Sequence, residues 1–145
     1  MTEVEFHTGV ADKFGFTCRL LRKAYRKGAR VLVTAPSPVL GQLDRELWTF
    51  DERDFVPHLR VTGGKTALAA RTPIWLMEGS DGPPLQGTPD VLVNLGAEPP
   101  QDLSPFTRVI EIVADEPDEE QAGRQRWRTY KARGLEVVHH PAAAR

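Results

Sequence analysis

Short apolar runs alternate along this chain with longer stretches in which apolar residues recur at every third or fourth position. A short, nearly continuous apolar run predicts a buried strand, and the wider spacing predicts a helix with one apolar side. The runs that predict strands cover residues 4–7, 30–34, 74–77, 90–95 and 108–113, with a last one at 135–138. The spacing predicts helices over residues 12–27 and from residue 37 onward, and Pro117 and Gly134 bound a last predicted helix over 117–133.

Capping residues support the predicted helix ends. Asp12 is placed to cap the first helix and Gly28 to stop it, because aspartate accepts from free backbone N–H groups and glycine adopts a positive φ. Ser37 and Pro38 predict a capped second helix with a proline in its first turn, and Pro117 begins the last helix. The apolar sides of the first two helices are Phe16, Leu20, Leu21, Ala24 and Tyr25, and then Leu40, Leu43, Leu47 and Trp48.

The order of these elements predicts the fold class. Strands that alternate with helices favour an α/β domain in which helices flank a mostly parallel sheet. A length of 145 residues suits one domain, so we expect residues 1–145 to form a single unit whose last five or so residues are a frayed tail.

Composition narrows the cellular setting. No apolar run approaches the roughly 18 residues that a membrane span needs, and the start of the chain carries no secretory pattern, so we expect a cytoplasmic protein. The net charge of −1 argues against a non-specific nucleic-acid coat. Cys18 is the only cysteine and cannot form an internal disulfide, so we expect it to be buried inside the first helix.

Residues 63–66, Gly-Gly-Lys-Thr, invite comparison with a phosphate-binding loop. Such a loop needs a glycine five residues before Gly64, and that position is Leu59. The loop should also enter a helix, and the next clear signal is the strand at 74–77. A simple Gly-Gly turn is therefore favoured, and a nucleotide-binding α/β enzyme with Lys65 and Thr66 at the phosphates is the alternative.

No other motif predicts catalysis. The chain has no G-x-S-x-G and no H-E-x-x-H, and His139-His140 would need further ligands to bind a metal. We interpret the two histidines as part of a polar tail. We therefore expect no catalytic residue, no cofactor and no metal site.

The sharpest local feature is a change of charge near the last helix. Acidic residues crowd positions 115–120, and basic residues follow at Arg124, Arg126, Arg128, Lys131 and Arg133. Helical spacing places Arg124, Trp127 and Arg128 on one face, where two guanidinium groups beside an indole can hold a carboxylate next to an apolar side chain. The plain alternative is a solvated basic helix whose Trp127 and Tyr130 face the core. Direct DNA binding by this helix is disfavoured by its acidic neighbour.

A second aromatic feature surrounds residues 47–58. The sequence Leu-Trp-Thr-Phe is followed five residues later by Phe-Val-Pro-His, so that Trp48, Phe50 and Phe55 flank a short charged linker. These aromatics could belong to the core, or they could form an exposed patch for a permanent protein contact. Sequence leaves both interpretations open.

These segments together resemble the chi subunit family of bacterial DNA polymerase III. The most specific matches are Leu47-Trp48 followed by Phe55-Val56-Pro57-His58, and a last helix with Arg124, Trp127, Arg128, Tyr130 and Lys131. The other matching segments are 27–33, 43–44, 90–95, Phe106 with 109–113, and Gly134.

The resemblance implies an α/β fold like that of nucleotide-binding proteins but without a nucleotide site. It implies a non-catalytic subunit that links the clamp loader to the acidic C-terminal tail of single-stranded DNA-binding protein. By that similarity Arg124 and Arg128 hold the carboxylates of the tail, and Val113, Trp127 and the turn at Gly134 shape its apolar pocket.

The resemblance also implies a second face at Trp48 and Phe55. That face would bind the psi subunit or another clamp-loader protein, or an accessory helicase. DNA would be reached only indirectly, and no membrane contact is expected.

Overall fold

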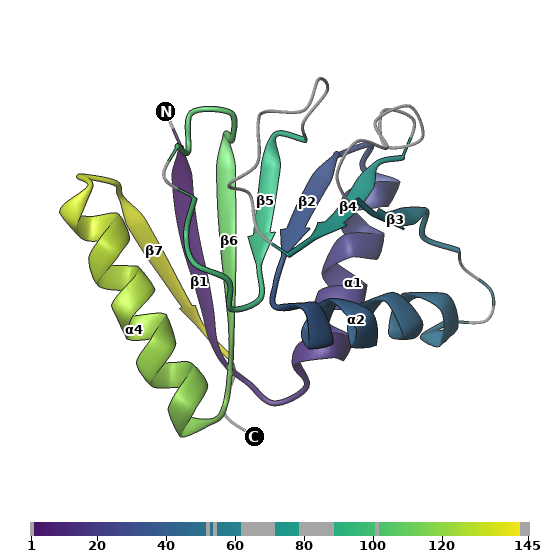
Figure 1. Ribbon diagram of the computed structural model, residues 1–145, viewed down its shortest axis with the longest axis horizontal. Helices are drawn as coiled ribbons and strands as arrows, with labels where there is room; N and C mark the ends of the chain where they lie inside the picture. Colours follow the sequence, from purple (N-terminus) through teal and green to yellow (C-terminus); the bar gives the residue numbers. More distant parts are fainter. Residues whose placement is uncertain are drawn as a thin grey trace.

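The fold is built around one sheet in which every pair of neighbouring strands is parallel. The computed structural model describes residues 2–51, 53, 55–61, 72–78, 89–100 and 102–142. The strands are β1 (Glu3–Val10), β2 (Val31–Thr34), β3 (His58–Arg60), β4 (Ile74–Met77), β5 (Val91–Asn94), β6 (Arg108–Ala114) and β7 (Val137–Pro141). Their order across the sheet is β3-β4-β2-β5-β6-β1-β7 (Figure 1). The prediction of a single-domain α/β fold is confirmed.

Helices cover both faces of this sheet. Alternate residues of each strand point to opposite faces, so each face has its own core. The helices α1 (Lys13–Arg26) and α2 (Ser37–Thr49) pack on the face that contains Val33 and Ile112. The helix α4 (Pro117–Ala132) packs on the face that contains Phe6 and Val109. In Figure 1, α4 lies along the half of the sheet formed by β7, β1 and β6.

The predicted helix ends are mostly confirmed. The Asp12 carboxylate accepts a hydrogen bond of 3.0 Å from the backbone N–H of Gly15, and Gly28 after α1 has a φ of 78°. The predicted cap at Ser37 is wrong, because Ser37 is already the first helical residue and its side chain makes no capping bond. Pro36 occupies the cap position instead.

Two residues on the predicted apolar sides of the first two helices are exposed. Trp48 and Tyr25 are 59% and 37% exposed, so their prediction as inward-facing residues is wrong. Trp48 follows the buried Leu47, and one residue step turns the side chain by about 100°, which carries it away from the buried stripe.

The strand predictions were wrong at two places. The short edge strand β3 was missed, and β7 continues through His139 and His140, which sequence assigned to a polar tail. Both histidines are held by parallel pairing with Phe6 and His7 of β1. Backbone pairing thus overrides their polar character.

Three further expectations concern the candidate phosphate loop, membrane spans and Cys18. The candidate phosphate loop at 63–66 lies outside the described residues. None of the described helices is long and apolar enough to cross a membrane. Cys18 is buried in α1 as predicted, and burial raises the pKa of its thiol to about 12.

Candidate functional site

A pocket of about 480 Å³ opens where the carboxyl ends of β1, β6 and β7 meet the first half of α4. Parallel strands end at the same edge of a sheet, and α/β proteins commonly bind ligands at that edge. The strands contribute Phe6, Thr8, Gly9, Val113 and His139, and α4 contributes Glu120, Gly123, Arg124 and Trp127. The volume suits one or two amino-acid side chains of a ligand.

A β-bulge shapes the strand side of the pocket. His7 pairs with Ile112 and Val10 with Ala114, so that Thr8 and Gly9 together stand opposite one residue of β6. Gly9 has a φ of 66°, a conformation that glycine adopts without strain. The bulge bends β1 beside the pocket and brings two of its residues to the rim.

The wall of the pocket on the helix side is apolar. Trp127 is half-buried and packs edge-on against Phe6, with ring centroids 5.2 Å apart. Gly123 allows α4 to approach β6, because a Cβ atom at that position would lie only 2.9 Å from a methyl carbon of Val113. The close approach places the indole directly over the end of the sheet.

Charged groups surround this wall. Arg124 and Arg128 are both exposed and lie one helical turn apart. Among the described residues, neither side chain makes a hydrogen bond or an ion pair. The ammonium group of Lys131 lies 5.7 Å from the centre of the Trp127 ring. Among the described residues that line the pocket, Glu120 is the only acidic one.

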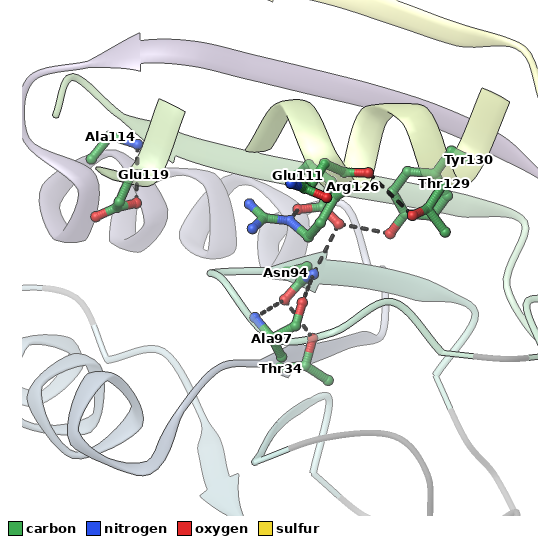
Figure 2. Close-up of polar contacts among 10 residues, drawn as sticks. Thr34, Asn94, Ala97, Glu111, Ala114, Glu119, Arg126, Thr129 and Tyr130 are labelled. Carbon is green, nitrogen blue, oxygen red and sulfur yellow. Dashed lines mark hydrogen bonds and ion pairs between the residues drawn. The ribbon is translucent and has the colours of Figure 1, made fainter. Parts of the chain in front are cut away.

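A buried polar cluster beneath α4 fixes how the helix is turned. The fully buried carboxylate of Glu111 accepts hydrogen bonds from Arg126 Nε at 2.8 Å and from Tyr130 Oη at 2.7 Å (Figure 2). It also accepts from Asn94 Nδ2 at 2.9 Å, and Thr34 donates to Asn94 Oδ1 at 3.1 Å. The cluster therefore joins α4 to three neighbouring strands of the sheet.

Burial governs ionisation in this cluster. Desolvation raises the pKa of Glu111, while the Arg126 guanidinium acts in the opposite direction. Burial and the Glu111 carboxylate raise the pKa of Tyr130 well above its usual range, so its hydroxyl remains a hydrogen-bond donor. The cluster is buried, which identifies it as an internal support of α4.

Sequence reasoning missed the role of Arg126. The charge pattern predicts that the basic side chains from 124 to 133 are exposed, yet Arg126 is buried. The guanidinium of Arg133 donates a hydrogen bond of 2.6 Å to the carbonyl of Pro100. Gly123, Arg126 and Tyr130 are the buried residues of α4, and their three- and four-residue spacing was a usable signal. The lone glutamate in the apolar strand β6, Glu111, was a second usable signal.

The structure brings part of the predicted tail site together. Val113, Arg124 and Trp127 all line the pocket, whereas Arg128 and Gly134 are not among the described residues that line it. Arg128 is exposed beyond the pocket on α4, and Gly134 follows the end of this helix with a φ of 79°. Sequence reasoning missed the contributions of Phe6, Thr8, Gly9 and His139, which come from other elements.

A separate aromatic patch consists of Trp48 and Phe55. Their rings stack 5.2 Å apart and are 59% and 55% exposed, whereas the neighbouring Leu47 and Val56 are buried. His58 meets the Trp48 ring edge-on and is held by Asp44 at 2.8 Å. Of the two interpretations that sequence left open, exposure favours the patch for Trp48 and Phe55, whereas Phe50 is partly buried and packs against the core.

The described residues contain no cluster of three histidine, cysteine, aspartate or glutamate side chains that could hold a metal ion. Fold and pocket together define a small α/β protein with an aromatic-walled pocket, which has an arginine among its lining residues, at the carboxyl edge of its parallel sheet.

The comparisons agree on one family. The family model for "DNA polymerase III chi subunit, HolC" matches residues 1–138. The DNA polymerase III subunit chi of Pseudomonas aeruginosa is 33% identical over 97% of this chain and 96% of its own length. Those of Haemophilus influenzae and Escherichia coli are 31% and 26% identical over 81% and 83% of this chain, and over 78% and 79% of their own lengths. The chain belongs to the DNA polymerase III chi subunit family and is an accessory subunit in DNA replication.

Proposed function

We propose that this chi subunit is a non-catalytic cytoplasmic adaptor that binds the acidic C-terminal tail of single-stranded DNA-binding protein in the α4 pocket. The observation that carries the proposal is Arg124, an arginine without an internal partner among the described residues, at the rim of an apolar pocket walled by Trp127. An unpaired guanidinium is free to take a carboxylate, and the pocket takes an apolar side chain beside it.

The direction of the tail follows from the distribution of charge along α4. The apolar terminal side chain enters between Trp127 and Val113, and its free carboxylate pairs with Arg124. Arg128 and Lys131 continue the positive surface along the helix, where they meet acidic residues further up the tail. Gly134 lies beyond this path and acts by ending the helix.

The same proposal assigns the aromatic patch to the clamp-loader side. Trp48 and Phe55 form an exposed stacked pair held in place by His58, and exposed aromatic pairs of this kind are frequent anchors of protein contacts. The partner of this patch is the psi subunit or another clamp-loader protein, with an accessory helicase as an alternative occupant.

Calorimetric titration with a short acidic peptide ending in Pro-Phe tests the tail site. We expect micromolar affinity that weakens as salt is added, because charge pairing contributes. Arg124→Ala should weaken binding at least about tenfold, since a hydrogen bond to a charged group contributes about 1.5–3 kcal/mol.

Two controls sharpen this titration. Arg45→Ala removes an exposed arginine from α2 and should leave the affinity unchanged. A peptide with an amidated C-terminus should bind more weakly to the wild-type chain, but it should lose little further affinity with Arg124→Ala. No measurable binding, or equal loss with Arg124→Ala and Arg45→Ala, would contradict the proposal.

A further inference from the structure

A strongly basic segment lies on the face of the sheet opposite α4. It takes no part in the α4 pocket or in the aromatic patch of Trp48 and Phe55. Residues 13–30 contain seven lysine and arginine side chains and no acidic residue. The rest of the chain then holds 12 basic against 20 acidic residues, so the near-neutral total of −1 conceals a pronounced separation of charge.

Some of these seven cations have clear partners inside the chain. Lys13 pairs with Glu119 at 3.0 Å, and Arg22 pairs with Asp51 at 2.9 Å. Arg30 packs on the ring of Trp75. These contacts explain three of the cations by structure alone.

Arg19, Lys23 and Lys27 have no such explanation. All three are exposed, and within the described part of the chain none of their side chains makes a hydrogen bond or an ion pair. Arg19 and Lys23 lie one turn apart on α1, and Lys27 caps the C-terminal end of this helix four residues further on, so the three side chains follow one side over about 12 Å. We call these three residues the α1 stripe. Attraction to the negative end of the helix accounts for cations in the last turn, but it does not account for Arg19 in the middle.

We propose that the α1 stripe is a contact surface for the phosphate backbone of duplex DNA. About 12 Å of duplex carries about seven phosphates, so each cation of the stripe can meet one. The family acts within a DNA polymerase, where a duplex is at hand. This direct contact departs from the expectation that DNA is reached only through partner proteins, and it does not depend on the α4 pocket.

The chemistry of the stripe favours a duplex over other polyanions. Single-stranded DNA is usually held by aromatic side chains that stack on its bases, and the stripe contains none. Tyr25 is the exposed large apolar residue of α1, and helical geometry turns it about 200° from Lys23. An acidic peptide would also need pockets for side chains, and the stripe consists of extended cationic side chains only.

Fluorescence anisotropy with a short labelled duplex tests this contact on the full chain. Between about 50 and 200 mM salt, three phosphate contacts predict a slope of about −2.7 for log affinity against log salt, which is an affinity loss of about 40-fold. The triple variant Arg19→Gln, Lys23→Gln, Lys27→Gln should bind at least tenfold more weakly at the lowest salt and lose most of the slope. Glutamine keeps helix propensity close to that of the residues it replaces.

The matched control removes the same charge elsewhere. Arg45→Gln, Arg53→Gln and Arg60→Gln together neutralise three exposed arginines outside the stripe, and this variant should retain the affinity and slope of the wild-type chain. Lys23→Gln alone should lose about a third of the slope. Equal thermal midpoints for all variants would show that they remain folded.

Several results would overturn the proposal. One is that the wild-type chain does not bind the duplex at low salt. Another is that the stripe variant and the control variant lose the same amount of duplex affinity. Tighter binding to a single strand or to polyglutamate than to the duplex would overturn it as well. Because none of these measurements involves the tail peptide, failure here is distinct from failure of the tail site.

Discussion

Arg124 and Arg126 lie two residues apart on α4, and the turn of the helix places them in opposite environments. Arg126 is buried and paired with Glu111, whereas Arg124 is exposed at the pocket rim. The same side chain thus supports the helix at one position and remains available to a ligand at the other. Burial and partners decide the role, and residue type alone does not.

Replacing Arg126 should destabilise the fold strongly. Arg126→Ala leaves the carboxylate of Glu111 buried without its cation, and removal of one partner from a buried pair costs about 3–5 kcal/mol. Urea unfolding should show this loss as a lower midpoint. Arg128→Ala removes an exposed arginine from the same helix and should change the free energy of unfolding by less than about 0.5 kcal/mol. Equal effects of the two substitutions would mean that the buried cluster does not hold α4.

Glu120 offers a test of the charge of the ligand. It is acidic and lines a pocket assigned to an acidic tail, so it should repel the peptide. Glu120→Gln should tighten tail binding about two- to fivefold, as expected for loss of one partly screened repulsion. A weaker affinity in the same titration would indicate that the pocket prefers a cation.

At the scale of elements, the spacing between α4 and β6 depends on Gly123. Gly123→Ala brings a Cβ atom to 2.9 Å from Val113, and such overpacking costs about 1–3 kcal/mol, against a gain of up to about 1 kcal/mol in helix propensity. Gly41→Ala in α2 is the matched control, since the nearest atom there is a flexible arginine end at 3.6 Å.

The denaturant midpoints of Gly41→Ala and Gly123→Ala should therefore shift in opposite directions relative to the wild-type chain. Gly41→Ala should stabilise the protein by about 0.5–1 kcal/mol, while Gly123→Ala should destabilise it and weaken tail binding. Stabilisation by both substitutions would show that α4 can shift away from β6 without loss.

The elements that sequence predicted well are those with a strong periodic signal. The central strands are continuous apolar runs, and α1 and α2 carry clear apolar stripes, so their positions followed from residue spacing. The position of α4 followed instead from Pro117 and Gly134 at its ends. The edge strand β3 has only three residues, none of them fully buried, and gives no such signal. His139 and His140 join a strand because β1 offers a parallel partner, which local sequence cannot reveal.

Residue spacing predicted the pocket only on its helix side, and Val113 on β6 was expected only from the family resemblance. Arg124 and Trp127 share one helix, so their spacing placed them together. Phe6 and the bulge at Gly9 come from the far end of the sequence, and only the pairing of β1 with β6 brings them to the same cavity. Contacts at such separation depend on sheet order, for which a single sequence carries little information.

At the scale of the whole molecule, three surfaces occupy different elements. The pocket lies beside α4, the aromatic patch follows α2, and the stripe lies on α1. In Figure 1, α1 lies on the face of the sheet opposite α4. Separate surfaces allow an accessory subunit to hold more than one partner at once. The sheet separates the pocket beside α4 from α1 and α2, which pack together on the opposite face.

Nuclear magnetic resonance of the isotope-labelled chain, titrated with the Pro-Phe-terminated acidic peptide, tests the central claim most directly. The account predicts that the largest saturable shifts fall on the Trp127 indole N–H and on the backbone amides of Gly9, Val113 and Gly123. Signals from Trp48 and from the α1 stripe should stay in place. Largest shifts at Trp48 or at the α1 stripe, or no saturable shift around Trp127, would contradict it.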